Sequence, residues 1–414
     1  MSSEQMRSDA MTILRGAIGA QLPGSEVQKL LSQTEFNENG RLIVIAAGKA
    51  AGDMADAAAR VLRERISRGL VITKYGHAKA VPEGMELIEA GHPIPDENSV
   101  KAAKRALETV RGLSADDTVL FLLSGGASSL FEAPLLPLSE LIDVNGQLLR
   151  SGADITEINA VRKRLSAVKG GRFARACSPA RVINVILSDV LGNRADMVAS
   201  GPCCPDSTSS RDALNTVEKY NLTLSGEALS LLTKPTVTRL DNSETHVIGS
   251  VEKLCESAAE ICASLGYKPI VMTSSLTMEA RDAGKMLART AAENQDTKAS
   301  LAFLWGGETV VRVTGSGKGG RNQELVLSAC AGLSGLRDTL VFSVGSDGSD
   351  GPTDAAGGIA DESTYMRLLE KGVDPAAALE NNDSYNALNA LDALIFTGPT
   401  GTNVNDLSAV LIKR

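Results

Sequence analysis

Residues 117–126 read DTVLFLLSGG, an apolar run that ends in a pair of glycines. A strand buried on both faces has this pattern, and such strands belong to parallel sheets. Similar runs lie on either side of it, LIVIAAG at 42–48 and ARVINVILSDV at 180–190, and helical patterns separate the three. Strands that alternate with helices imply right-handed crossovers and a mainly parallel sheet. We therefore predict an N-terminal Rossmann-like, three-layer α/β sandwich.

A second series of strand-like runs begins near residue 244 and continues toward the C-terminus. Its members are THVIGS (245–250), KPIVMTSS (268–275), SLAFLWGGE (300–308), TVVRVTG (309–315), TLVFSVGS (339–346) and ALIFTG (393–398). The polar stretch between the two series has no clear strand, so we place a domain boundary near residue 240. We predict two α/β domains, residues 1–240 and a smaller domain at 241–414, in a chain long enough for two or three. The last apolar run, in NDLSAVLIKR, fits a strand of either domain.

Composition and charge exclude several classes of protein. The net charge is −8, from 42 Lys and Arg against 50 Asp and Glu, and only 3% of residues are aromatic, so a general nucleic-acid binder is not expected. The three histidines lie far apart and none of the six cysteines has CxxC spacing, which argues against a zinc site and a disulfide scaffold. Without a signal peptide or an apolar run near the ~20 residues that cross a bilayer, we expect a soluble, cytoplasmic protein that does not bind membranes.

Two glycine-containing turns follow predicted strands and are suited to bind an anion. AAGKAAG places Lys49 at the opening of a helix, where free N–H groups and the helix dipole favour negative charge. SGGASS combines Gly125 and Gly126, which let the backbone approach a ligand, with the hydroxyl donors of Ser124 and Ser128. The structural alternatives are a surface lysine on an ordinary turn and a tight turn capped by serines.

Acidic residues also stand at the ends of predicted strands. Asp189, in SDVLGNRADMVASGP, follows a buried strand, where a carboxylate can act as a base, hold a metal or cap a helix. Asp347, Asp350 and Asp354 crowd the glycine-rich segment GSDGSDGPTDAAGG. Carboxylates at that density repel each other unless a cation lies among them, so this segment is a candidate Mg²⁺ site, with a solvated acidic loop as the alternative.

In the segment GGETVVRVTGSGKGGRNQE at 306–324, we predict that Glu308 projects from a tight turn or bulge at the two glycines. Lys318 and Arg321 then stand at the predicted start of a helix. The segment contains G-x-G-x-x-G, but the preceding strand follows a turn and not a βαβ crossover, so it does not meet the dinucleotide fingerprint. It also lacks the Ser or Thr of a P-loop. What remains is a flexible loop with two cations, suited to a phosphate or a carboxylate. In TGPTGTNVNDL, Asn403, Asn405 and Asp406 follow a strand end and form a polar turn that could orient a substrate hydroxyl.

Together these features provide cations in two loops, an acidic loop fit for Mg²⁺ and no plausible covalent nucleophile. Phosphoryl transfer needs this combination, because its catalysis consists mostly of positioning and charge neutralisation. The residues therefore favour a phosphotransferase.

Nine blocks of the sequence resemble the glycerate 2-kinase family, whose members carry a C-terminal MOFRL-type domain and are sometimes labelled hydroxypyruvate reductases. The blocks, in chain order, are IAAGKAAGDMA, AGHPIPDENS, LSGGASSL, RKRLSAVKGGR, LSDVLGNRADMVASGP, GGETVV, GKGGRNQE, VGSDGSDGPTDAAGG and TGPTGTNVNDL. The resemblance implies two α/β domains with the active site in the cleft between them. It also implies ATP, Mg²⁺ and D-glycerate as ligands and 2-phosphoglycerate as product.

The resemblance also assigns residues. The family's active-site lysine and arginine fall on Lys49 and Arg321, and its other polar positions fall on Asp189, Glu308, Asp347 and Asn403. Lys49 is then expected to neutralise the transferring phosphoryl group, and Arg321 to hold that group or the glycerate carboxylate. Asp189, or Glu308 in its place, would accept the proton of the 2-hydroxyl. Asp347 and Asp350 would hold Mg²⁺, directly or through water, and the SGGASS turn would cradle phosphate oxygens.

Two other functions stay open. One is an NAD(P)H-dependent hydroxypyruvate reductase, favoured by the α/β pattern and the G-x-G-x-x-G run. The other is a non-catalytic sensor of a sugar acid or nucleotide. The expected partners are small molecules, D-glycerate and ATP, with no nucleic acid and no membrane. A homodimer is a possible assembly.

Overall fold

The computed structural model describes residues 3–77, 81–188, 190 and 194–414. The chain divides into two compact units, Pro23–Ile248 and the combination of Met1–Leu22 with Gly249–Arg414. Each unit is built on its own six-stranded sheet. No helix in the described part of the chain is long and apolar enough to span a membrane.

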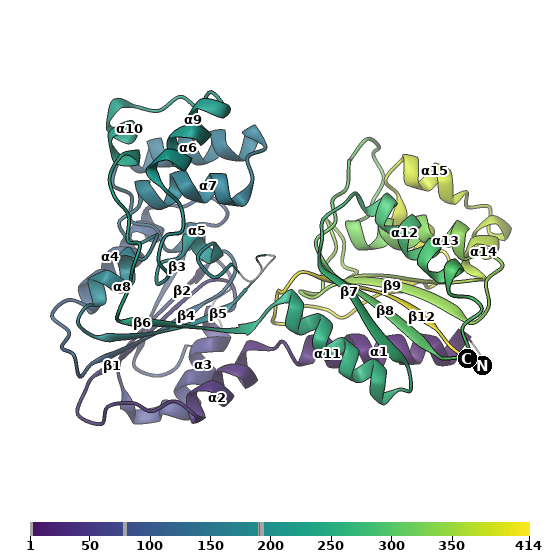
Figure 1. Ribbon diagram of the computed structural model, residues 1–414, viewed down its shortest axis with the longest axis horizontal. Coiled ribbons are helices and arrows are strands. Elements are labelled where there is room, and N and C mark those ends of the chain that lie inside the picture. Colours follow the sequence, from purple (N-terminus) through teal and green to yellow (C-terminus); the bar gives the residue numbers. More distant parts are fainter. Residues whose placement is uncertain (1–2, 78–80, 189, 191–193) are drawn as a thin grey trace. The chain divides into compact units, whose positions relative to one another are not determined.

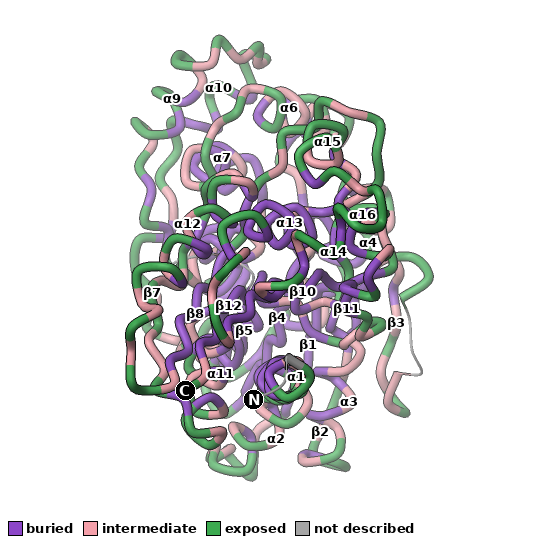
Figure 2. Tube along the Cα trace, turned by 90° about the vertical axis from the view of Figure 1, so that its right-hand side faces the viewer, coloured by how far each residue is buried: buried purple, intermediate pink, exposed green. Residues whose placement is uncertain are grey.

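The sheet of the first unit has the strand order β3-β2-β1-β4-β5-β6 (Figure 1). The four pairings among the first five of these strands, from β3 to β5, are parallel. Its strands are β1 (Leu42–Ala47), β2 (Ile66–Lys74), β3 (Met85–Ala90), β4 (Thr118–Leu123), β5 (Arg181–Leu187) and β6 (Ser243–Gly249). Because β1 and β4 lie in the middle of the sheet, every residue of both strands is buried (Figure 2). The α/β class and the mainly parallel sheet predicted from the sequence are confirmed.

Helices cover both faces of this sheet. They are α2 (Pro23–Ser32), α3 (Ala51–Leu62), α4 (Glu97–Thr109), α5 (Ala127–Leu130), α6 (Leu138–Ser151), α7 (Ile155–Arg162), α8 (Arg172–Cys177), α9 (Ser210–Lys219) and α10 (Gly226–Leu232), with 3₁₀ turns η1 (Arg63–Arg65), η2 (Lys163–Leu165) and η3 (Val198–Ser200). Helices α4, α5 and α8 share one apolar core with the strands. Helices α6, α7, α9 and α10 form a separate cluster farther from the sheet (Figure 1).

The second unit has the strand order β11-β10-β9-β12-β8-β7 and a mixed sheet. Its strands are β7 (Lys268–Leu276), β8 (Leu301–Gly307), β9 (Thr339–Gly345), β10 (Gly357–Asp361), β11 (Leu394–Ile395) and β12 (Asp406–Ile412). Its helices are α1 (Ser3–Gly19), α11 (Val251–Ser264), α12 (Ala280–Glu293), α13 (Arg321–Leu333), α14 (Thr364–Glu370), α15 (Pro375–Glu380) and α16 (Ser384–Asn389). Helices α1 and α11 cover one face of the sheet, and α12 and α13 cover the other (Figure 1).

The structure differs from the expected division of the chain in two places. The run THVIGS, expected to open the second series, forms β6 at the edge of the first sheet. The N-terminal helix α1 packs on α11 of the second unit, because its apolar face is buried there and Asp9 accepts hydrogen bonds from Tyr267 Oη at 2.8 Å and Lys413 Nζ at 3.4 Å. The final apolar run, which fitted either domain, becomes β12 in the middle of the second sheet.

The prediction of a strand at 309–315 is wrong. The chain leaves the sheet after β8, and Val310 forms only an isolated bridge with Glu279. Val310 and Val313 are 56% and 74% exposed, and of the valines in this run only the partly buried Val311 packs against the core. The segment that follows is held instead by backbone and side-chain hydrogen bonds to residues 381–383.

Candidate active-site residues

The two anion-binding turns predicted from the sequence are bonded to each other at the carboxyl end of the first sheet. The backbone N–H of Ala50 donates to Ser124 Oγ at 3.0 Å, and the N–H of Lys49 donates to the carbonyl of Gly125 at 2.9 Å. Gly48 has φ +126°, and a methyl group on it would lie 2.2 Å from Ser124 Oγ. Glycine is required at this point because the two turns approach too closely for a side chain. Ser124 therefore fixes the backbone that presents Lys49.

The Lys49 side chain is exposed and extends over the second turn. A methyl group on Gly126, where φ is +86°, would lie 3.4 Å from Cγ of Lys49 and 3.0 Å from Nε2 of His92. Lys74, the last residue of β2, also acts on His92 and lowers its pKa. Lys74 and His92 were not predicted as site residues, although both stand where strands of a parallel sheet end, which is the signal that could have identified them.

A buried lysine is hydrogen-bonded to the backbone of the SGGASS turn. Lys169 donates to the carbonyl of Ser128 at 2.8 Å and to the carboxylate of Glu132, and both charged side chains are almost fully buried. Burial lowers the pKa of Lys169, and the neighbouring Glu132 opposes that change. The lysine thus holds the carbonyl of Ser128 in place through an ion pair shielded from water.

Replacing Lys169 by methionine should lower the free energy of unfolding by about 3–5 kcal/mol, because Glu132 would remain buried without its counter-ion. Urea denaturation measures the loss. Lys219→Met is the matched control: it also breaks a lysine–glutamate pair, but Lys219 is 59% exposed and its pair with Glu157 is screened by water. Equal losses in the two variants would contradict the role given to Lys169.

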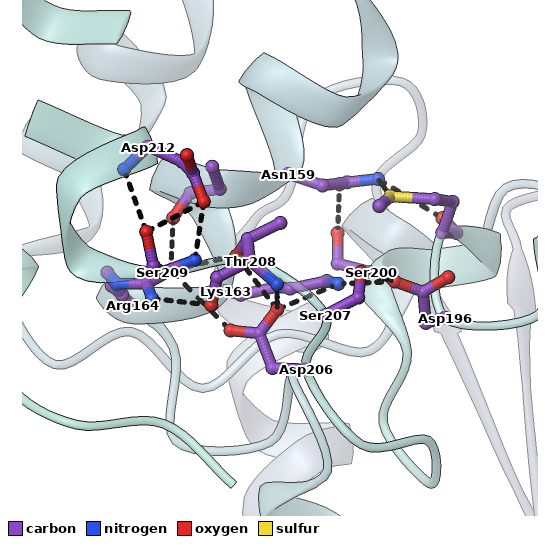
Figure 3. Close-up of polar contacts among 12 residues, drawn as sticks. Asn159, Lys163, Arg164, Asp196, Ser200, Asp206, Ser207, Thr208, Ser209 and Asp212 are labelled. Atoms are coloured by element: carbon purple, nitrogen blue, oxygen red, sulfur yellow. Dashed lines mark hydrogen bonds and ion pairs between the residues drawn. The ribbon is translucent and has the colours of Figure 1, made fainter. Parts of the chain in front are cut away.

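A second buried network orders the segment that follows β5 (Figure 3). Lys163, in η2, lies 3.1 Å from a carboxylate oxygen of Asp196 and 3.1 Å from one of Asp206, while the Arg164 guanidinium donates to Oγ1 and the carbonyl of Thr208 at 3.0 Å. Burial raises the pKa of Asp206, but Lys163 and the Thr208 hydrogen bonds outweigh it, so the net pKa is lowered. This network ties the RKRLSAVKGGR block to residues 194–209. Asp189, the candidate base, lies outside the described residues.

The second unit gathers its charges around Arg321, the first residue of α13. Its Nε and one terminal nitrogen donate to the two carboxylate oxygens of Asp406 at 2.6 and 2.8 Å, and its other terminal nitrogen lies 3.1 Å from Glu308 Oε1. A guanidinium has five N–H donors, so two remain for an anion. The side chain is 30% exposed, which leaves it accessible. Arg321 and Glu308 were predicted from the sequence as site residues, and Asp406 as part of the polar turn after a strand, but its pairing with Arg321 was not predicted.

Burial raises the pKa of Asp406 to about 6, Arg321 opposes this change, and the charges of Asp350 and Glu308 reinforce it. The pKa of Arg321 is raised, because its hydrogen bonds and attraction to Asp406 exceed the opposing effect of burial. The arginine therefore stays charged, and its fork is fully oriented only when Asp406 is ionised.

The two aspartates proposed for Mg²⁺ have different surroundings. Asp350 is buried and accepts from the backbone N–H groups of Asn322 at 3.1 Å and Gln323 at 2.9 Å, so both of its oxygens cap helix α13. Asp347 is half-buried, and its Oδ1 accepts from Ser349. A methyl group on Gly345 would lie 3.4 Å from Oδ1 of Asp347 and 3.5 Å from Oδ1 of Asp406, so both carboxylates lie beside the end of β9. Oxygen donors of this kind fit Mg²⁺, although no cluster of three metal-binding side chains occurs among the described residues.

The remaining candidates lie around the same strand ends. Lys318 is exposed, its ammonium lies 3.8 Å from the ring centroid of Tyr385 and 3.8 Å from Asp354, and it makes no described contact with Arg321. Asn403 Oδ1 accepts from the N–H of Asn405 at 3.4 Å, and the carbonyl of Asn405 accepts from Ser346 just beyond β9. The structure thus brings Glu308, Arg321, Asp347, Asp350 and the asparagine turn together and directs Lys318 elsewhere.

Comparisons with known proteins cover nearly the whole chain. Residues 9–233 match a family described as a domain of unknown function, DUF4147, and residues 301–406 match the MOFRL family. The chain is 48% identical to the D-glycerate 2-kinase of Thermotoga maritima over 99% of both chains. It is 39% identical to a glycerate 2-kinase of Pyrococcus horikoshii (94% and 91% covered) and 41% identical to a putative hydroxypyruvate reductase of Agrobacterium vitis (90% and 100% covered).

Solved structures agree with the sequence matches. The crystal structure of a Thermotoga maritima glycerate kinase superposes with a TM-score of 0.94 at 48% identity, over 99% of this chain and 100% of the other. That of a Pyrococcus horikoshii protein gives 0.86 at 37% identity, over 99% and 98%. The identity, the coverage and the two family matches lead to one conclusion: this chain belongs to the glycerate 2-kinase family.

Proposed function

We propose that the protein is a glycerate 2-kinase, which transfers the γ-phosphoryl group of ATP to the 2-hydroxyl of D-glycerate and forms 2-phosphoglycerate. The observation that carries the proposal is the preorganised Arg321, whose fork is fixed by Asp406 and Glu308 while two N–H donors have no partner within the described part of the chain. A rigid cation with spare donors suits a transferring phosphoryl group or a carboxylate.

The candidate residues then have complementary roles. Lys49 neutralises charge on the transferring phosphoryl group, and the backbone and hydroxyl groups of Ser124 to Ser128 bind its oxygens. Asp347 would hold Mg²⁺, and Asp350 would contribute through water, since its own oxygens already accept from helix N–H groups. The ion would neutralise charge on the ATP phosphates. Asn403 and Asn405 orient the hydroxyl groups of glycerate.

The reaction makes one bond and breaks one. The 2-hydroxyl oxygen of glycerate attacks the γ-phosphorus, the bond from that phosphorus to the β–γ bridging oxygen breaks, and ADP leaves with the electron pair. The hydroxyl proton passes to a carboxylate, for which we keep Asp189. Glu308 is the alternative, but its carboxylate is already paired with Arg321.

The local structure argues against the reductase alternative. The glycine loop at 315–320 does not follow a strand, as a dinucleotide fingerprint requires. Its glycines are needed for a different reason: a methyl group on Gly315 would lie 2.3 Å from the carbonyl of Asn381, and one on Gly317 would lie 2.5 Å from Cβ of Asp383. These glycines let two loops pack together.

The first experiment incubates the purified protein with ATP, Mg²⁺ and D-glycerate and follows ADP release, with enolase added to identify the 2-phosphoglycerate. A parallel reaction contains NADH or NADPH with hydroxypyruvate. ADP release with direct enolase turnover supports the proposal. Oxidation of NAD(P)H without ADP release would overturn it, and ligand-dependent melting without either reaction would indicate a sensor.

The kcat should fall as the pH drops below about 6, the pKa of Asp406, because a protonated Asp406 no longer orients both donors of Arg321. This pKa lies above that of a free carboxyl group, about 4, so between these values the folded state binds the proton more tightly than the unfolded chain does. Protonation of Asp406 by itself therefore stabilises the folded state as the pH falls, so unfolding would not explain the fall in kcat. A pH–rate profile with circular dichroism at each pH tests this, and Asp406→Asn should lack the acid limb.

A further inference from the structure

Basic side chains from three consecutive strand ends of the first unit act on one another near Gly126, and two of them, Lys49 and His92, lie beside it. Lys49 follows β1, Lys74 ends β2, and His92 follows β3. A methyl group on Gly126 would lie 3.0 Å from both Nε2 and Cδ2 of His92 and 3.4 Å from Cγ of Lys49. The imidazole and the lysine stem therefore both border the space that a side chain at Gly126 would fill. This places a titratable ring directly beside the turn proposed to bind phosphate oxygens.

The charges that act on His92 within the described residues are all positive. Burial lowers its pKa first, and the charges of Lys49, Lys74 and His77 lower it further. A half-buried imidazole among cations stays neutral near neutral pH. Binding an anion at this point would reverse the balance, because negative charge next to the ring favours its protonated form.

The two nearby carboxylates are engaged elsewhere. Glu89, on β3, accepts the backbone N–H of Gly76 at 2.8 Å and acts on His77. Asp96, at the start of α4, accepts from Tyr75 Oη at 2.6 Å and from the N–H of Ser99 at 2.9 Å. Neither is among the groups that shift the pKa of His92. Lys79 lies outside the described residues.

We propose that His92 is an anion-binding residue that takes up a proton from solvent when a phosphoryl oxyanion binds between it and Lys49. The inference deepens the proposed function, on which it rests for the identity of the anion. Neutral His92 leaves the empty turn with less repulsion between cations, and protonated His92 adds a hydrogen-bond donor and a charge when the ligand arrives.

The coupling between protonation of His92 and anion binding predicts how the anion affinity changes with pH, in both sign and size. Binding raises the pKa of His92, so the bound state holds more protons than the free state. The dissociation constant should therefore fall as the pH falls, by up to about tenfold per pH unit between the free and bound pKa values. Sulfate is a suitable probe because it is a phosphate-like dianion whose own charge does not change over this range.

The chain offers a direct readout because it has only three histidines, His77, His92 and His246. In the full-length protein with labelled histidine, sulfate should raise the pKa of His92 measured by NMR, while His246 on β6 serves as the internal reference. Calorimetry should show a sulfate affinity several-fold higher at about pH 5.5 than at about pH 8, with proton uptake. His92→Asn should abolish most of this pH dependence, and His246→Asn should keep it.

An unchanged His92 titration at saturating sulfate, no sulfate binding, or an unaltered pH dependence in His92→Asn would each overturn the inference. The NMR titration is made on the wild-type protein, so the inference can be tested even if His92→Asn fails to fold. Failure of the kinase proposal looks different: no ADP would be released while the sulfate-linked titration of His92 persisted. Normal ADP release with an unresponsive His92 would remove this inference alone.

Discussion

Replacement of Lys49 by alanine should lower kcat by at least about a hundredfold, the scale expected when a preorganised charge at a developing anion is removed. The fold should survive, because the backbone of Lys49, and not its exposed side chain, makes the hydrogen bond to Gly125. Turnover assays with saturating ATP and D-glycerate measure the loss, and thermal melting verifies that the variant is folded.

Lys29→Ala is the control for this experiment, since Lys29 is an exposed lysine of the same unit on α2. It should retain wild-type turnover and melting. Lys49→Arg adds a second comparison: it restores the charge with a different shape, so partial recovery would indicate a role in charge neutralisation. Near-wild-type turnover in Lys49→Ala would remove the residue from the mechanism.

Replacement of Arg321 by alanine should damage both activity and stability. Turnover should fall by at least about a hundredfold, because the fixed donors are lost. The free energy of unfolding should fall by about 3–5 kcal/mol, because the Asp406 side chain, 6% exposed, would be buried without its partner. Steady-state kinetics and urea denaturation measure the two effects separately.

A double variant separates those effects. Arg321→Ala combined with Asp406→Asn removes the unpaired charge, so it should recover part of the stability and none of the activity. Arg321→Lys keeps the positive charge but loses the fork, and should remain well below wild type. Recovery of turnover in the double variant would show that the arginine acts only by stabilising the fold.

Local sequence was sufficient to predict many individual elements. DTVLFLLSGG corresponds to β4, and LIVIAAG corresponds to β1, because a strand buried on both faces must be apolar throughout. Glycines and polar residues after these strands marked the turn that carries Lys49 and the turn at Ser124, because irregular backbone at strand ends needs such residues. The same reasoning failed at 309–315, where β-branched residues lie outside any sheet and Val310 and Val313 are exposed.

Pairing of the strands lay beyond what local sequence could predict. THVIGS has the composition of a strand in either unit, and only its hydrogen bonds place it at the edge of the first sheet. Helix α1 likewise reads as the first helix of the N-terminal domain, yet its apolar face is buried in the second unit. A strand or an amphipathic helix specifies that it must be buried, but it does not specify its partner.

The sequence by itself determined the α/β class, the turns at the strand ends and the residue types that suit phosphoryl transfer, because these depend on neighbours along the chain. Only the tertiary structure decided which charges act together. Asp406 orients Arg321 from 85 positions away, and His92 reaches the turn at Gly126 from a different strand end. Such contacts depend on sheet order and on burial, which raise the pKa of Asp406 and lower that of His92, and no local pattern encodes them.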